Sequence, residues 1–181
     1  LLMLLVGNAT KHQRAFQAHE KTYEATIRLG TQTNTGDAAG TLLRTAPVPA
    51  LERARVVETL SSLRGPFWQQ PPTYSAIKVR GRPAYWWARR QQPVTLAPRL
   101  VHLLEMAFVD LTDHTITFSV RCSAGTYVRS LAEVIAERLG TVGHLDGLVR
   151  QRIGSWTLAE AKPLSWIREA TFSRVFARPS Q

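Results

Sequence analysis

The chain has 181 residues, of which 44% are hydrophobic and 20% charged, so its composition argues against disorder and favours one soluble globular domain. Its formal net charge of +10 indicates a polyanionic partner, namely RNA, DNA or an anionic membrane surface, although a codon bias toward arginine would give the same balance. Cys122 is the only cysteine, which excludes a disulfide within the chain and a cysteine zinc site.

The first half of the chain mixes helix and strand patterns. Its opening run, LLMLLVG, is too short for a membrane span and lacks the basic start of a signal peptide. In chain order, the patterns predict a helix over 6–19, a strand over 21–29, a loop over 30–40, a strand over 41–45, an amphipathic helix over 51–63 and a Pro/Gln loop over 65–72.

The second half gives a strand pair and further helices. The patterns predict strands over 101–110 and 114–122, a helix over 129–139 that Gly140 ends, a helix or loop over 145–153, and a short helix after Pro163 within 158–176. The elements follow no regular βαβ order, so an α+β fold is expected.

One long segment is basic and aromatic. No Asp or Glu occurs between Glu58 and Glu105, while the same interval carries six of the chain's aromatic residues. Its basic residues are Arg64, Lys78, Arg80, Arg82, Arg89, Arg90 and Arg99. A positive field attracts phosphates, and exposed aromatic rings stack on unpaired bases. The alternative is aromatic core residues beneath a solvated basic surface; nucleic-acid binding is the favoured interpretation.

Several familiar site motifs are missing from the sequence. There is no GxxxxGK[ST] or GxGxxG loop for nucleotide phosphates, no HExxH metal motif and no GxSxG nucleophile elbow. The five histidines are scattered along the chain. If the protein is an enzyme, it is therefore expected to work without a metal or an organic cofactor.

Four longer stretches are specific when they are taken together. They are KTYEATIRLG with TNTGDAAG at 21–40, PPTYSAIKVRG with AYWWAR at 71–89, CSAGTYVRSLAEVIAERLG at 122–140 and GHLDGLVRQRIG at 143–154. Their order and spacing resemble the bacterial tRNA pseudouridine-55 synthase family, the TruB type, from about residue 7 to about residue 158.

The resemblance implies a fold and an activity. The expected fold is the pseudouridine synthase fold, a mixed and mostly antiparallel sheet flanked by helices, incomplete at the N-terminus. Residues 1–155 would be the catalytic domain, with a thumb-like RNA-binding segment at about 74–100, and 156–181 the C-terminal part or the start of an extension. Such a protein would be a cytoplasmic monomer that flips a tRNA T-loop uridine from its stack and isomerises it without a cofactor or metal.

The resemblance also implies residue roles. Tyr23 would lie against the flipped base and is a candidate for proton abstraction at C5, while Tyr127 and Leu148 would line the base pocket. Arg129 would orient the catalytic aspartate, because a buried carboxylate needs a nearby cation to stay ionised. The expected RNA contacts are Lys78, Arg80, Arg82, Arg89 and Arg90.

One family feature is absent from the 181 residues. The nucleophilic aspartate belongs to a GxLDPxATG-type motif, and none of Asp37, Asp110, Asp113 and Asp146 lies in such a motif. The chain is therefore expected to be an N-terminally truncated fragment that is inactive alone. The alternative is a non-catalytic RNA-binding module or RNA chaperone. A DNA-binding domain has little support, since neither helix-turn-helix nor zinc-finger spacing is found.

Overall fold

A central antiparallel sheet organises the molecule. The structure is a computed structural model that describes residues 1–92 and 94–169. The sheet has six strands in the order β10-β9-β1-β8-β7-β4. Their bounds are β1 Lys21–Leu29, β4 Gly65–Gln69, β7 Arg99–Leu111, β8 Thr115–Cys122, β9 Gly143–Ile153 and β10 Trp156–Thr157. Two short hairpins stand outside this sheet, β2 Thr31–Thr33 with β3 Leu42–Thr45, and β5 Lys78–Val79 with β6 Arg82–Pro83.

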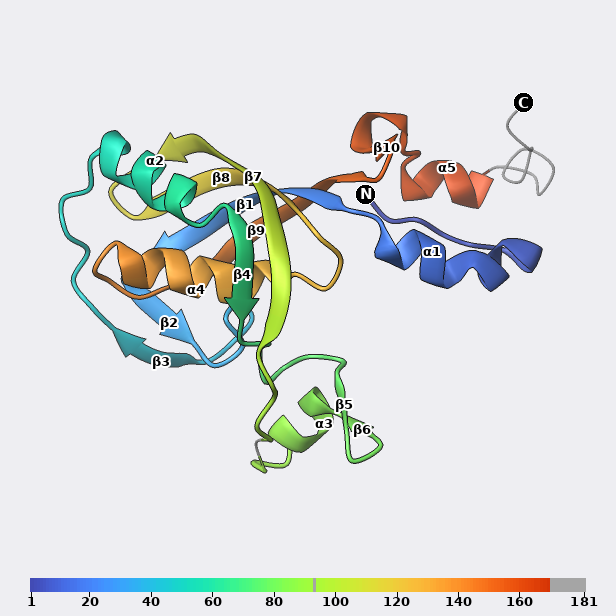
Figure 1. The fold of residues 1–181 in the computed structure, drawn as a ribbon, viewed down its shortest axis with the longest axis horizontal. Helices are drawn as coiled ribbons and strands as arrows, with labels where there is room; N and C mark the ends of the chain where they lie inside the picture. The colour runs from blue at the N-terminus through green and yellow to red at the C-terminus, as the bar shows by residue number, and fades with distance from the viewer. Residues whose placement is uncertain (93, 170–181) are drawn as a thin grey trace.

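Two helices cover one face of the sheet and close the core (Figure 1). They are α2 (Arg53–Ser62) and α4 (Val128–Arg138), which pack on β7 and β9 respectively. The alternation of β8 turns Ile116, Phe118 and Val120 into this core, where each is completely buried. The opposite face is polar, with Thr26 and Thr117 hydrogen-bonded at 3.1 Å across β1 and β8.

The remaining elements lie at the margins of the sheet (Figure 1). At the N-terminal side are η1 (Gly7–His12) and α1 (Gln13–Ala18), and after β10 come η2 (Leu158–Glu160) and α5 (Leu164–Glu169). A short helix, α3 (Ala84–Ala88), joins the β5–β6 hairpin in a lobe that projects from the ends of β4 and β7. In residues 1–92 and 94–169, no helix is both long and apolar enough to cross a membrane.

Most of the expected elements are confirmed. The strand predicted over 21–29 is β1, the helix over 51–63 contains α2, the strand pair is β7 and β8, and the helix over 129–139 is α4. Gly140 follows the last turn of α4 with a φ of 87°, the left-handed conformation that ends many helices. Part of the helix expected within 158–176 is found as α5; the rest of that prediction lies outside the described residues.

Three predictions were wrong, and all of them missed strands. The expected loop over 30–40 contains β2, which pairs with β3 through one register shift. The expected loop over 65–72 contains β4, where Pro66 is tolerated because β4 is an edge strand that pairs only with β7. The expected helix or loop over 145–153 is β9, which pairs with β1 through two register shifts. Such bulges break the two-residue alternation by which a strand is recognised in sequence.

The helix α4 packs tightly against Gly143, the first residue of β9. A Cβ atom there would lie 2.7 Å from Cβ of Ala136 and 3.0 Å from the carbonyl oxygen of Arg28. We expect Gly143→Ala to lower the free energy of unfolding by about 1–3 kcal/mol, because a packed core resists an inserted methyl group. Urea unfolding of the chain measures this.

Gly147→Ala is the matched control on the same strand, since its new Cβ would meet Thr26 only at an ordinary 3.4 Å. A Gly143→Ala variant as stable as this control would contradict the packing described for α4 and β9.

Candidate functional site

Four side chains singled out in the sequence gather at one end of the sheet. Because β1 and β8 are antiparallel, Tyr23 near the start of β1 lies beside Val120 near the end of β8. The chain then turns through Gly125, whose φ is 85°, and enters α4 at Tyr127 and Arg129. On the other side of β1, Leu148 of β9 is opposite Ala25 and shares its face of the sheet. Tyr23 and Leu148 therefore lie on the face of the sheet on which α4 packs.

Arg129 is the best-connected side chain of this end. One guanidinium nitrogen, Nη1, donates to the carbonyl oxygen of Thr35 at 2.8 Å and to Oδ2 of Asp37 at 3.1 Å. The other, Nη2, donates to the carbonyl oxygen of Tyr74 at 2.8 Å. The arginine therefore joins α4 to the 33–37 loop and to the first residue of the predicted thumb.

Asp37 is held on both of its carboxylate oxygens. Besides the ion pair with Arg129, its Oδ1 accepts hydrogen bonds from Oγ1 of Thr35 at 2.7 Å and from the backbone N–H of Ala39 at 3.2 Å. Its side chain is 31% exposed. These bonds fix the carboxylate as a structural partner of the arginine.

A second set of contacts ties the start of α4 to the end of β4. The Gln69 amide donates from Nε2 to the carbonyl oxygen of Tyr127 and accepts at Oε1 from the backbone N–H of Tyr127, each at 2.8 Å. Gln69 is only 2% exposed, so its amide replaces water for both backbone groups. Ser130 adds a bond from its hydroxyl to the carbonyl oxygen of Gln70 at 2.9 Å.

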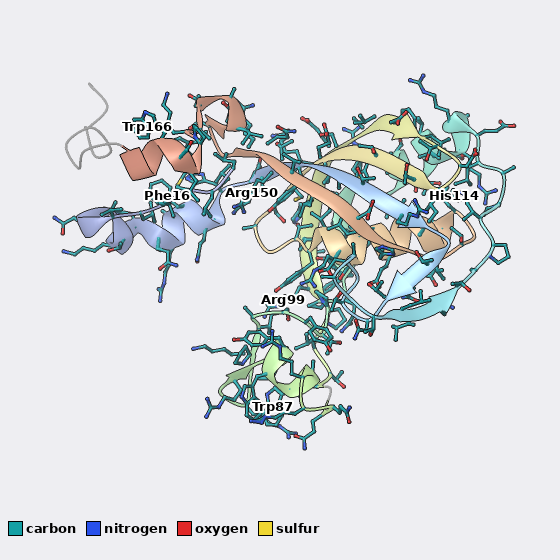
Figure 2. The ribbon with its side chains drawn as sticks, turned by 180° about the vertical axis from the view of Figure 1, so that it is seen from behind. Phe16, Trp87, Arg99, His114, Arg150 and Trp166 are labelled. Atoms are coloured by element: carbon teal, nitrogen blue, oxygen red, sulfur yellow. The ribbon has the colours of Figure 1, made fainter. Side chains whose placement is uncertain are left out.

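Tyr23 packs against the core cluster and lies opposite Arg150 of β9. Burial raises the pKa of the Tyr23 phenol, and the Arg150 guanidinium partly offsets this rise. The phenol is therefore neutral at neutral pH. Arg150 also donates from Nε to the carbonyl oxygen of Leu1, and the Leu1 amino group donates to the carbonyl oxygen of Arg150 at 3.0 Å. Figure 2 shows Arg150 near the junction between the sheet and the α1 side.

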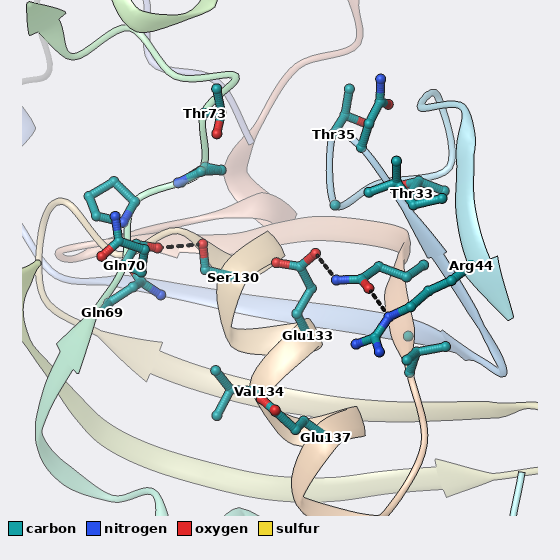
Figure 3. Close-up of a pocket in the computed structure, with 18 of the residues that line it drawn as sticks. Thr33, Thr35, Arg44, Gln69, Gln70, Thr73, Ser130, Glu133, Val134 and Glu137 are labelled. Carbon is teal, nitrogen blue, oxygen red and sulfur yellow. Dashed lines mark hydrogen bonds between the residues drawn. The ribbon is translucent and has the colours of Figure 1, made fainter. Parts of the chain in front are cut away.

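A pocket of about 530 Å³ lies on the outer side of α4, between the 32–36 loop and the 67–73 segment (Figure 3). Glu133 points into it and accepts a hydrogen bond from Nε2 of Gln32 at 3.3 Å, while Gln32 in turn accepts one from Arg44 at 2.7 Å. Burial raises the pKa of the Glu133 carboxyl, and the Gln32 bond and the charge of Arg129 partly offset the rise.

The structure places all five basic residues of the predicted RNA surface on the projecting lobe that contains β5, β6 and α3. Lys78, Arg80, Arg82, Arg89 and Arg90 are exposed there. Among the described residues, ion pairs involve only Arg121 and Arg129, so these five cations are available to solvent. Among those same residues, no cluster of His, Cys, Asp or Glu could hold a metal ion.

Sequence reasoning missed three contributors to the site. Gln69 lies in the stretch that was expected to be a loop, and Arg150 in the segment that was expected to be a helix or loop, so neither could be placed beside its partner. Glu133 falls within the predicted helix, but only the tertiary fold shows that it is half-buried. The one local signal that could have pointed to Gln69 is its position as a polar residue at the end of an apolar strand.

The Gln69 amide offers a direct test of the link between β4 and α4. We expect Gln69→Ala to lower the free energy of unfolding by about 1–3 kcal/mol, because it leaves the backbone N–H of Tyr127 without a partner and leaves the Tyr127 carbonyl oxygen only the bond from the backbone N–H of Leu131. Gln70→Ala is the control, since the exposed Gln70 side chain makes one bond, to the carbonyl oxygen of Leu96. Equal urea midpoints for the two variants would refute this description of the amide.

The raised pKa of Glu133 predicts that the free energy of unfolding depends on pH. A carboxyl with a raised pKa binds its proton more tightly in the folded state, so the free energy of unfolding falls as pH rises from the carboxyl's ordinary range through the raised pKa. Glu133→Gln removes this loss and should be more stable than the parent at about pH 7 but not at about pH 4. Urea unfolding at both pH values measures the difference, with the exposed Glu58→Gln as control. A parent whose stability does not fall relative to Glu133→Gln would contradict the prediction.

Comparisons with known proteins show the family to which the chain is related. The family model described as TruB family pseudouridylate synthase, N-terminal domain, matches residues 1–128. The tRNA pseudouridine synthase B of Hydrogenovibrio crunogenus is 42% identical over 167 residues, covering 92% of this chain and 55% of that protein. The tRNA pseudouridine synthase B of Burkholderia lata is 45% identical over 172 residues, covering 94% of this chain and 52% of that protein. The chain thus spans about half the length of these curated relatives.

The fold is also found among solved structures. A chain of a Cbf5-Nop10-Gar1 complex superposes with a TM-score of 0.58 at 22% identity, over 83% of this chain and 35% of that one. A chain of an H/ACA RNP bound to a substrate RNA containing 2'-deoxyuridine gives a TM-score of 0.55 at 18% identity. At such identities the likeness shows the fold alone, whereas the family model covers most of the sequence. The chain belongs to the TruB family of pseudouridylate synthases.

Proposed function

We propose that the chain is the larger part of the catalytic domain of a tRNA pseudouridine synthase that converts uridine 55 of the T-loop to pseudouridine. The proposal is supported by the placement of Tyr23 and Leu148 on the sheet face on which α4 packs, with Tyr127 and Arg129 at the start of that helix. Relatives at 42% and 45% identity bear the name tRNA pseudouridine synthase B, which supports the same reaction class.

The pocket residues would replace the stacking that a flipped uracil loses. Tyr23 presents a half-buried ring, and Leu148 presents a side chain that is 46% exposed in the absence of RNA. Flipping costs a few kcal/mol, and apolar and aromatic surfaces recover part of that cost. The phenol of Tyr23 is neutral at rest, so abstraction of the C5 proton by this residue requires a phenolate, which the adjacent charge of Arg150 stabilises.

The nucleophilic carboxylate in this proposal comes from outside the 181 residues. Asp37 is engaged on both oxygens and serves to hold Arg129. Asp110 and Asp113 lie at the β7–β8 turn, which is the opposite end of β8 from α4. Asp146 is an exposed residue of β9. We propose that the positive charge of Arg129 favours the ionised form of the incoming carboxylate.

The RNA would be held by the lobe at about 74–100, which we propose acts as a thumb on residues 1–155. Its exposed cations suit a T-arm backbone, and its attachment through Tyr74 and Gln69 links it to the start of α4. Residues 156–181 would begin a C-terminal part. We propose that the protein works as a cytoplasmic monomer without a metal or organic cofactor.

A tritium-release assay with 5-tritiated T-arm RNA tests the proposal. The 181 residues alone should release no tritium. The same chain joined to the segment that precedes the matching residues in the Hydrogenovibrio crunogenus relative should release it, and an Asp→Asn change in that segment should abolish release. Normal turnover by the 181 residues alone would overturn the assignment of the nucleophile. Tight T-arm binding by the joined protein without release would instead indicate a non-catalytic RNA-binding module.

Arg129→Ala in the joined protein should reduce turnover at least about tenfold more than it reduces T-arm affinity, because its charge acts on the reacting carboxylate. Arg138→Ala, on the same helix with an exposed bond to Ser62, is the control and should change neither quantity. Equal losses of turnover and affinity for Arg129→Ala would show that the arginine acts by holding RNA or the thumb.

A further inference from the structure

Two guanidinium groups of the thumb share one indole ring. The Cζ atom of Arg90 lies 3.9 Å from the centroid of the Trp86 ring, and that of Arg82 lies 5.5 Å from it. Both distances are within the range of a cation–π interaction. Arg82 lies in β6, just before α3, and Arg90 lies just after α3. The ring of Trp86, which belongs to α3, therefore contacts one arginine that precedes the helix and one that follows it.

Trp86 is itself held in place by its neighbour. The rings of Trp86 and Trp87 meet edge to face, with centroids 4.8 Å apart and an interplanar angle of 81°. Trp87 is fixed in turn by a hydrogen bond from its Nε1 to the carbonyl oxygen of Val79 at 3.0 Å. Figure 2 shows Trp87 in the projecting lobe, away from the sheet. The β5–β6 hairpin thereby sets the orientation of the ring on which the arginines stack.

No carboxylate among the described residues forms an ion pair with Arg82 or Arg90. The 59–104 interval contains no carboxylate, and neither arginine takes part in an ion pair among residues 1–92 and 94–169. Two like charges near one ring repel each other, and the cation–π contacts offset part of that repulsion. Phosphates bound to the two arginines would offset it, and a phosphate has the geometry that guanidinium groups recognise.

We propose that Trp86 is a positioning residue that preorganises Arg82 and Arg90 as one clamp for consecutive phosphates of the T-arm backbone. This inference rests on the proposed function, since it takes tRNA as the ligand of the thumb. An arginine on a flexible stem loses side-chain freedom when it binds, and stacking on a fixed indole removes part of that loss before the RNA arrives. The indole contributes through the arginines and not by stacking on a base.

A double-mutant cycle tests this on the 181-residue chain, with affinity for a T-arm stem–loop measured by fluorescence anisotropy at several salt concentrations. Trp86→Leu should weaken binding about 5- to 30-fold, because two arginine side chains must then be ordered on binding at a cost of about 0.5–1 kcal/mol each. Replacing Arg82 and Arg90 by Ala together should weaken binding and reduce the salt slope by about 1.5. In that double-alanine background, Trp86→Leu should cost no more than about twofold.

Trp68→Leu is the matched control, because Trp68 is 68% exposed on β4 and stacks on no arginine among the described residues; its affinity should equal the parent's. Trp86→Phe keeps an aromatic ring and should bind between the parent and Trp86→Leu, which provides a second reading if the leucine variant unfolds.

The outcomes separate the inference from the function on which it rests. If Trp86→Leu costs as much without the two arginines as with them, Trp86 contacts RNA directly and the clamp is refuted, while T-arm binding stands. If the double-alanine variant binds the T-arm as tightly as the parent, the thumb is not the RNA surface, and the proposed RNA interface fails together with the clamp.

Discussion

The guanidinium group of Arg129 is the interaction on which this end of the molecule depends. It donates to Thr35, Asp37 and Tyr74, so one rigid, permanently charged fork joins the start of α4, the 33–37 loop and the base of the thumb. Those three segments are separated by 37 and more residues in sequence. Their common partner gives an otherwise loop-rich region a defined geometry.

The rest of the site is arranged around that fork by ordinary β-sheet geometry. Antiparallel pairing puts the start of β1 beside the end of β8, and α4 follows directly from β8. The buried Gln69 amide then ties the end of β4 to Tyr127, so the thumb leaves the sheet from a fixed point. A protein that must recognise a flipped base and its RNA backbone together needs these two surfaces in a constant relation.

The sequence predicted the parts of this arrangement that have a local signal. The alternation of β1 and β8, the amphipathic patterns of α2 and α4, and the carboxylate-free basic segment were all readable, and the four quoted stretches identified the family now shown by comparison. The roles of Tyr23, Tyr127, Arg129 and Leu148 stay predictions. The partners of Gln69 and Arg129 were not readable, because Tyr127 and Asp37 are far from them in sequence. Arg150 could not be placed beside Tyr23, because bulges disrupt the alternation by which β9 would have been recognised.

The most direct measurement is a crystal structure of this chain with a T-arm stem–loop that carries 5-fluorouridine at position 55. We expect a flipped uracil between Tyr23, Tyr127 and Leu148, the Arg129 guanidinium still bonded to Asp37 or Tyr74 beside it, and the backbone phosphates against Arg82 and Arg90. A stem–loop whose uracil stays stacked, or that binds the polar face of the sheet, would contradict the central claim that this end of the sheet is the base pocket.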